Sequence, residues 1–118
     1  MDSKNIESFY PLSPMQQGML FHSLFAPDSG VYVEQMAATL QGKLDVALFA
    51  RTWQFLVDRH PILRSAFAWE GLKEPIQVVQ RTAPVVLQEQ DWRGLPAAEQ
   101  RKQLAAFAIQ DQNAGFDL

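Results

Sequence analysis

The sequence predicts an α+β fold in which helices lie on a small, mostly antiparallel sheet. Two observations lead to this class. Long segments carry apolar residues at helical spacing, and the shorter segments between them alternate apolar and polar residues. Cap and turn residues separate these segments and give the order helix, strand, helix, strand, strand, strand, helix. We expect a two-layer α/β sandwich that forms one domain over residues 11–118, after an extended leading segment at residues 1–10.

The first helix is predicted from its N-terminal cap. The Ser13 hydroxyl can accept from a backbone N–H of the first turn, and Pro14 suits the first helical position. Gln16 stands where a capping box takes Glu or Gln, so its side chain can reach back to the Ser13 backbone. The apolar face continues to about Phe25, and the turn residues at 27–30 end the helix.

A strand is expected next at 31–41, because apolar side chains alternate there. A second helix follows, capped by Asp45 and ending at Asp58 or Arg59, since Pro61 disfavours helical backbone at the residue before it. One stripe of this helix is apolar and should face the core: Val46, Phe49, Trp53 and Leu56.

Three further strands are expected in the middle of the chain. The period changes to two over residues 62–69, where Arg64 lies on the face opposite the large apolar residues. Gly71 and the dipeptide at 74–75 indicate a hairpin turn into a strand at 76–80. Another short strand is expected at 85–89.

A third helix is predicted from Pro96 to about Asn113. Gly115 is a natural C-terminal stop, because glycine readily adopts the left-handed conformation that ends many helices. The apolar side of this helix consists of Leu104, Phe107, Ala108 and Ile109.

Composition excludes several classes of function. The net charge is −3 and acidic and basic residues are interspersed, so no stripe of Lys and Arg is present to bind nucleic acid. Cysteine is absent, which rules out disulfides and thiolate chemistry and suits a cytoplasmic protein. No apolar run approaches the roughly 18 residues that a membrane span needs, and the N-terminus does not have the pattern of a signal peptide.

Candidate catalytic and metal-binding residues are few. The two histidines, His22 and His60, lie far apart in the sequence, and no Gly-x-Ser-x-Gly turn is present. We expect His22 to lie near the end of the first helix and His60 to mark a junction between helix and strand. Two isolated histidines with scattered carboxylates do not make a metal site, and the dispersed glycines do not make a phosphate loop.

Two segments carry a resemblance to a known family. Residues 13–22 read Ser-Pro-Met-Gln-Gln-Gly-Met-Leu-Phe-His, and residues 59–67 read Arg-His-Pro-Ile-Leu-Arg-Ser-Ala-Phe. In this order they resemble the first two signature motifs of the condensation domains of non-ribosomal peptide synthetases. Residues 30–35 and 115–118 extend the resemblance, the latter as a lead into a further strand. The family's catalytic His-His-x-x-x-Asp-Gly motif is not in these 118 residues, so we expect no catalytic residue in this chain and no activity from it alone.

The resemblance implies a fold and roles for individual residues. The fold is similar to that of chloramphenicol acetyltransferase, of which this chain would be most of the N-terminal lobe and therefore incomplete. The first helix, with Ser13, Gln16 and Gly18, is implied to line a substrate tunnel. Arg64 is implied to face the active site and to hold the aspartate of the third motif, whereas Arg59 would anchor its helix end. The alternative from the residues alone is that Ser13 and Gln16 only cap a helix and that Arg64 faces solvent.

The resemblance also implies partners. Donor and acceptor carrier-protein domains would deliver substrates on phosphopantetheine, so we expect no cofactor bound directly by this chain. The C-terminal part of the domain would be a further partner, and a lobe edge left open after Leu118 would favour self-association. Three alternatives stay open: an epimerization or heterocyclization domain of the same fold, a domain that both epimerizes and condenses, and a non-catalytic module that binds a carrier protein.

Overall fold

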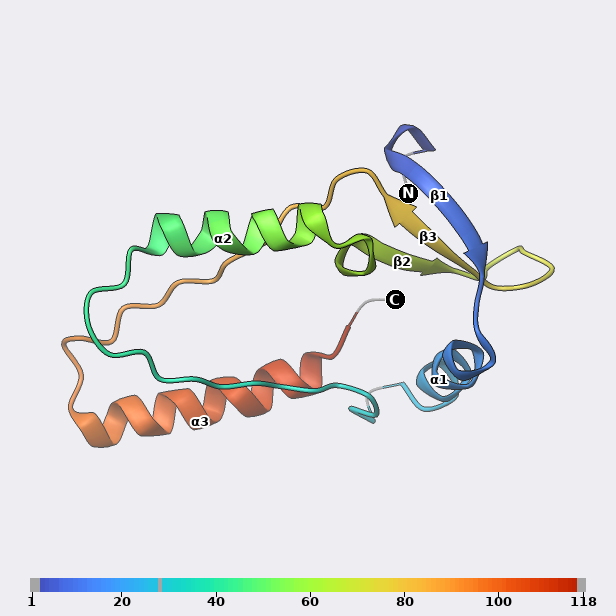
Figure 1. Cartoon of the computed structure of the whole chain (residues 1–118). Coiled ribbons are helices and arrows are strands. Elements are labelled where there is room, and N and C mark those ends of the chain that lie inside the picture. The colour runs from blue at the N-terminus through green and yellow to red at the C-terminus, as the bar shows by residue number, and fades with distance from the viewer. Residues whose placement is uncertain (1–2, 28, 117–118) are drawn as a thin grey trace. The chain divides into compact units, whose positions relative to one another are not determined.

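The computed structural model describes residues 3–27 and 29–116 and has a mixed α+β architecture (Figure 1). Three α-helices and two short 3₁₀-helices accompany a three-stranded sheet in the part of the chain that is described. The elements in chain order are η1 (Ser3–Asn5), β1 (Ile6–Pro11), α1 (Pro14–Phe25), α2 (Val46–Arg59), η2 (Pro61–Arg64), β2 (Ser65–Ala68), β3 (Ile76–Gln80) and α3 (Ala97–Ala114).

These elements belong to two compact units, and each unit is made of separate stretches of the chain. The first unit contains residues 3–17 and 39–87, and therefore the whole sheet and α2. The second contains residues 18–27, 29–38 and 88–116, and therefore α3. Helix α1 begins in the first unit and continues into the second.

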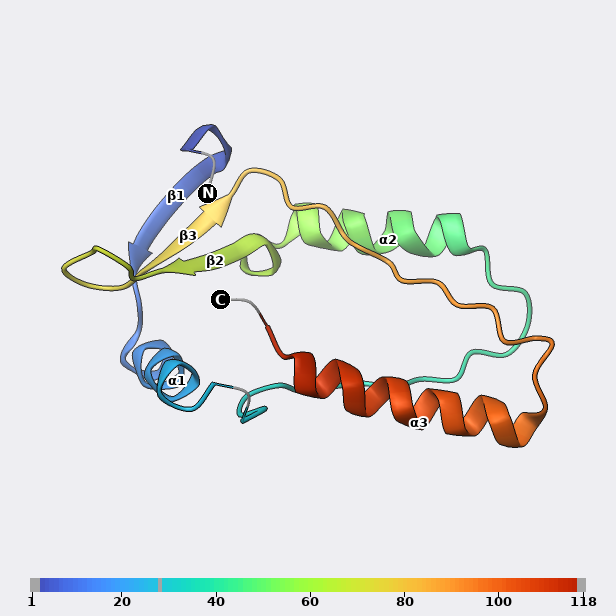
Figure 2. The same cartoon turned by 180° about the vertical axis from the view of Figure 1, so that it is seen from behind.

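The sheet is antiparallel, with β3 between β1 and β2, as both views show (Figures 1 and 2). The predicted strand at 76–80 is confirmed as β3. Its consecutive residues Val78 and Val79 are both buried, which means that both faces of the central strand are covered. The core of the first unit therefore lies at β3 and the adjoining Leu12.

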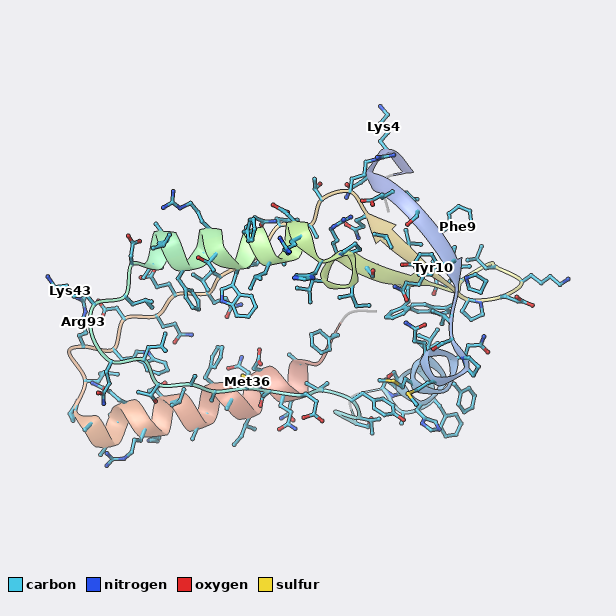
Figure 3. The ribbon with its side chains drawn as sticks, viewed as in Figure 1. Lys4, Phe9, Tyr10, Met36, Lys43 and Arg93 are labelled. Atoms are coloured by element: carbon cyan, nitrogen blue, oxygen red, sulfur yellow. The ribbon has the colours of Figure 1, made fainter. Side chains whose placement is uncertain are left out.

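Strand β1 was not predicted as a strand, because residues 1–10 were expected only to be extended. Its sequence has no clean alternation, and its outer residues Phe9 and Tyr10 are exposed (Figure 3). The strand forms because its backbone pairs with β3, about seventy residues further along the chain. Such a distant partner leaves no local pattern in the sequence.

Strand β2 is shorter than the predicted strand at 62–69. Residues 61–64 form the 3₁₀-helix η2 instead, in which Leu63 N donates to His60 O at 2.9 Å. Pro61 occupies the first turn of η2, where its fixed φ is favourable. The predicted hairpin is present: Gly71, at φ +70°, lies in the turn that joins β2 to β3.

Helices α1 and α2 confirm the predictions made from their caps. Asp45 Oδ1 accepts from Leu48 N at 2.8 Å, and α2 ends at Arg59, before Pro61. The end of α1 at Phe25 also agrees, although Asp28 of the expected turn lies outside the described residues.

The strand predicted at 85–89 is wrong. A glutamine side chain of α2 takes the place of a neighbouring strand: Gln54 Nε2 donates to Ala83 O at 2.9 Å, and Gln54 Oε1 accepts from Val85 N at 2.9 Å. These bonds satisfy the backbone of this segment without a sheet.

The strand predicted at 31–41 is also wrong. Tyr32 adopts φ +66°, a left-handed conformation that is incompatible with a regular strand. Within the same unit, Gln35 Nε2 donates to Ala108 O at 3.0 Å and to Asp111 Oδ2 at 2.8 Å, so a side chain holds this segment to α3.

Helix α3 confirms the third predicted helix and its stop. Gly115 has φ +62° and donates its N–H to Asp111 O at 3.3 Å. The lead into a further strand that was expected at 115–118 includes residues 117 and 118, which lie outside the described residues. Among the described helices, none combines the length and the apolar character that crossing a membrane requires.

Candidate functional site

Arg64 is a buried arginine, and its side chain is only 8% exposed. It is the last residue of η2, and the pairing of Ser65 with Val79 places it level with Gln80 at the end of β3. Its Nη1 donates to Glu7 Oε2 at 2.5 Å and also to the backbone carbonyl of Gln80. The alternative in which Arg64 faces solvent is therefore wrong.

Glu7 reaches Arg64 from an irregular position in β1. Ile6 pairs with Gln80 and Ser8 pairs with Val79, so Glu7 is an extra residue between two consecutive positions of β3. A β-bulge of this kind re-aims side chains next to it. Sequence reasoning did not find Glu7, because a bulge becomes visible only once the pairing of β1 with β3 is known.

One edge of the Arg64 guanidinium is left without a partner. Nη1 binds both acceptors, whereas Nε is buried and has no hydrogen-bond partner among the described residues. A buried donor without an acceptor costs about 1–3 kcal/mol. An additional acceptor, and above all a carboxylate, would be held strongly at this edge.

A separate polar network lies near the start of β3 and joins the two motif segments. The buried Gln77, 4% exposed, accepts from Gln16 Nε2 at 2.7 Å. Its own Nε2 donates to Ser65 Oγ at 3.3 Å, and Ser65 Oγ donates to Pro61 O at 2.8 Å. The first segment is thereby connected to the second through one side chain of the central strand. Sequence reasoning missed Gln77 because it counted only the apolar residues of β3.

The start of α1 has both hydrogen bonds of the expected capping box. Ser13 N donates to Gln16 Oε1 at 2.9 Å, and Gln16 N donates to Ser13 Oγ at 3.2 Å. Gln16 thus uses its amide oxygen for the cap and its amide nitrogen for Gln77. Gly18 follows in α1, where an added Cβ would meet no atom of the described structure within 4 Å, so close packing does not explain this glycine.

The remaining candidates have structural surroundings. Arg59 is exposed at the C-terminus of α2, where a cation is favourable beside the helix dipole. His60 follows it and donates its backbone N–H to Leu56 O at 3.0 Å. His22 Nδ1 and the Tyr32 hydroxyl are 2.9 Å apart. The described residues contain no group of three or more side chains suited to hold a metal ion.

One further charged pair is local and exposed. Arg93 Nε donates to Asp91 Oδ1 at 2.8 Å, in the segment that precedes α3 (Figure 3). The hydrogen bond from the Arg93 side chain, supported by the Arg93 backbone N–H, lowers the pKa of Asp91 from 3.8 to about 2. This pair shapes a turn and is not part of a pocket.

The fold and these contacts define an α+β unit in which two sequence motifs meet on one antiparallel sheet beside a buried, incompletely paired arginine. The chain belongs to the condensation-domain family of non-ribosomal peptide synthetases, because the family's sequence model, described as Condensation domain, matches residues 6–118.

Known proteins similar to the chain are very large by comparison. It is 52% identical over 115 residues to one protein of the linear gramicidin synthase of Brevibacillus parabrevis, which covers 98% of this chain and 2% of that protein. It is 40% identical over 116 residues to a plipastatin synthase protein of Bacillus subtilis, covering 98% and 3%. Identity to gramicidin S synthase 2 of Brevibacillus brevis is 36% over 115 residues, covering 98% and 3%. The chain therefore spans only a few per cent of the length of these relatives.

Proposed function

We propose that this chain is the N-terminal part of a condensation domain that forms amide bonds between aminoacyl or peptidyl thioesters carried by carrier proteins. The observation that carries the proposal is the buried Arg64, whose Nε has no acceptor among the described residues. The family match over residues 6–118 supports the same interpretation. In this proposal the chain forms most of a lobe similar to that of chloramphenicol acetyltransferase, and it works in the cytoplasm.

The reaction defines what the chain must contribute. The acceptor amine attacks the carbonyl carbon of the donor thioester, a C–N bond forms, the C–S bond breaks, and the amine loses a proton as the thiol leaves. Such a reaction depends on orientation and proton handling. Arg64 would not transfer that proton. Its role would be to hold the aspartate of the His-His-x-x-x-Asp-Gly motif at its free Nε edge, which organises the segment that carries the histidines.

The first motif would have a positioning role. Ser13 and Gln16 fix the start of α1, and the bond from Gln16 to Gln77 fixes that start on the sheet. The helix would line the tunnel through which phosphopantetheine brings substrates from the two carrier proteins. Open space beside Gly18 fits a helix face that a ligand passes. Arg59 would support the end of α2, and no cofactor would bind to the chain directly.

Two other interpretations use the same fold. An epimerization or heterocyclization domain, or a domain that both epimerizes and condenses, would share both motifs and would differ in the reaction. A non-catalytic module would bind a carrier protein without turnover. Titration with a carrier protein and the assay below separate these outcomes.

The test uses the joined domain, by which we mean this chain continued through a segment that carries His-His-x-x-x-Asp-Gly. Amide formation between two loaded carrier proteins is the readout. We expect turnover from the joined domain and none from the 118-residue chain alone. Turnover by the chain alone, or carrier binding without turnover by a folded joined domain, would overturn the proposal.

Three variants of the joined domain test the role of Arg64. Arg64→Lys keeps the charge and loses the planar fork, and we expect it to lower turnover about tenfold or more. Arg64→Met should lower turnover at least as much. Arg101→Met, at an exposed position of α3, is the matched control and should leave turnover unchanged. Full turnover by a folded Arg64→Lys variant would refute the assigned role.

Self-association is a further expectation. Many large apolar side chains are exposed, among them Met15, Phe21, Phe25, Met36 and Phe55. We expect light scattering of the 118-residue chain to show a mass that increases with concentration. A constant monomer mass would contradict this expectation.

A further inference from the structure

We propose that Glu7 is a positioning residue, which fixes the Arg64 guanidinium so that its Nε edge stays free for a second acid. This inference rests on the proposed function, because the second acid is the aspartate that the proposal assigns to the third motif. It adds a residue that lies outside both motif segments. Glu7 precedes the first motif in the chain and reaches the second motif through the sheet.

The β-bulge is the first step of the argument. Residues on either side of Glu7 pair with Gln80 and Val79, which are adjacent on β3, so Glu7 itself has no partner in the ladder. Without the extra residue, β1 would continue its alternation and a different side chain would stand next to Gln80. The irregular position thus brings a carboxylate to the one buried arginine of the described core.

The manner of binding is the second step. An arginine and a carboxylate often pair through two parallel hydrogen bonds, which occupy a whole edge of the guanidinium. Here Glu7 Oε2 and the Gln80 carbonyl share the single nitrogen Nη1. Two acceptors on one nitrogen of a planar group fix its plane and leave Nε buried and without a partner. A residue that served only to neutralise the charge would satisfy Nε as well.

Exposure is the third step. The Arg64 side chain is 8% exposed, whereas that of Glu7 is 43% exposed. Glu7 therefore holds the arginine from the solvent side, and the free Nε points into the protected part of the site. This arrangement predicts that Glu7 controls the orientation of Arg64 more than the stability of the sheet.

The activity test compares three variants of the joined domain. Glu7→Gln keeps the size and removes the charge, and Glu7→Asp keeps the charge with a shorter reach. Asn5→Ala is the matched control, because Asn5 tethers the start of β1 to Thr82 and Gln80 without a bond to Arg64. We expect Glu7→Gln to lower kcat about tenfold with KM changed less than about twofold. Glu7→Asp should recover part of the loss, and Asn5→Ala should lower Tm while leaving kcat within about twofold.

A second measurement does not depend on activity. In the 118-residue chain, the buried Arg64 Nε–H should give a resolved NMR signal with slow exchange, and Glu7→Gln should merge it with the signals of exposed arginines. Glu7→Gln with kcat equal to that of Asn5→Ala, or with the Arg64 signal unchanged, would overturn the inference. If Arg64→Lys loses turnover while Glu7→Gln keeps it, only the role of Glu7 fails. If Arg64→Lys keeps turnover, the role of Arg64 in the proposed function fails.

Discussion

Replacing Gln16 by methionine would test whether the two motif segments depend on each other. The change removes the amide that accepts from Ser13 N and donates to Gln77 Oε1. Loss of the cap bond is worth about 1 kcal/mol. The oxygen of Gln77, a residue that is 4% exposed, is left without this donor, at a cost of about 1–3 kcal/mol. We expect the free energy of unfolding to fall by about 2–4 kcal/mol in total.

Urea denaturation of the 118-residue chain, followed by circular dichroism at low concentration, measures this change. Gln17→Met is the matched control, because exposed Gln17 donates one bond, to Leu12 O at 3.2 Å, and its loss should cost no more than about 1 kcal/mol. The double variant Gln16→Met with Gln77→Met removes donor and acceptor together. We expect it to be at least about 1 kcal/mol more stable than the sum of the single changes implies.

Two results would refute this reasoning. Equal losses from Gln16→Met and Gln17→Met would show that the bond to Gln77 does not contribute to stability. Additive effects of Gln16→Met and Gln77→Met would show that the two side chains are not coupled. Either result would mean that the motif segments are held on the sheet by other contacts.

Two further predictions concern glycines and one exposed carboxylate. Gly18→Ala should raise the free energy of unfolding by about 1 kcal/mol, because the new methyl group meets open space, and should lower turnover of the joined domain if the helix lines a tunnel. Its control, Gly115→Ala, should lower it by about 1–3 kcal/mol because φ is +62° there. An NMR titration should give Asp91 a pKa of about 2, and Arg93→Gln should return it towards 3.8. The lowered folded pKa means that the pair's contribution is present above pH 3.8 and is lost as the pH falls through about 2; high salt should weaken it.

The helices could be predicted because their signals are local. Asp45 and Pro61 bound α2 within a few residues of its true ends, and Ser13 and Gln16 form the cap that their spacing indicates. Gly115 likewise ends α3 by its own conformation. Each of these signals acts over one turn of helix, so one short window of sequence contains both the cause and the effect.

Strands failed where a distant partner decided the structure. The alternation at 31–41 and 85–89 is real, but glutamine side chains at positions 35 and 54 hold these segments to helices. Conversely, β1 has a poor pattern and is a strand because β3 offers it an edge. A period of two shows that a segment could pair, and only the rest of the chain supplies the neighbour.

The site shows the same division between local and distant causes. The resemblance singled out Arg64, and the structure adds the reason why this arginine differs from the other basic residues of the second motif. Pro61 and the bond from Leu63 N to His60 O turn residues 61–64 into a 3₁₀-helix, which delivers Arg64 to the end of β3. Exposed Arg59, one helix end earlier, has no such turn beneath it. The second motif therefore has two tasks: Ser65 joins the network that reaches the first motif, and Arg64, its neighbour, is aimed at Glu7 and the end of the same strand. Moving either task by one residue would exchange the two faces of β2, which is why a change in the length of η2 should damage both.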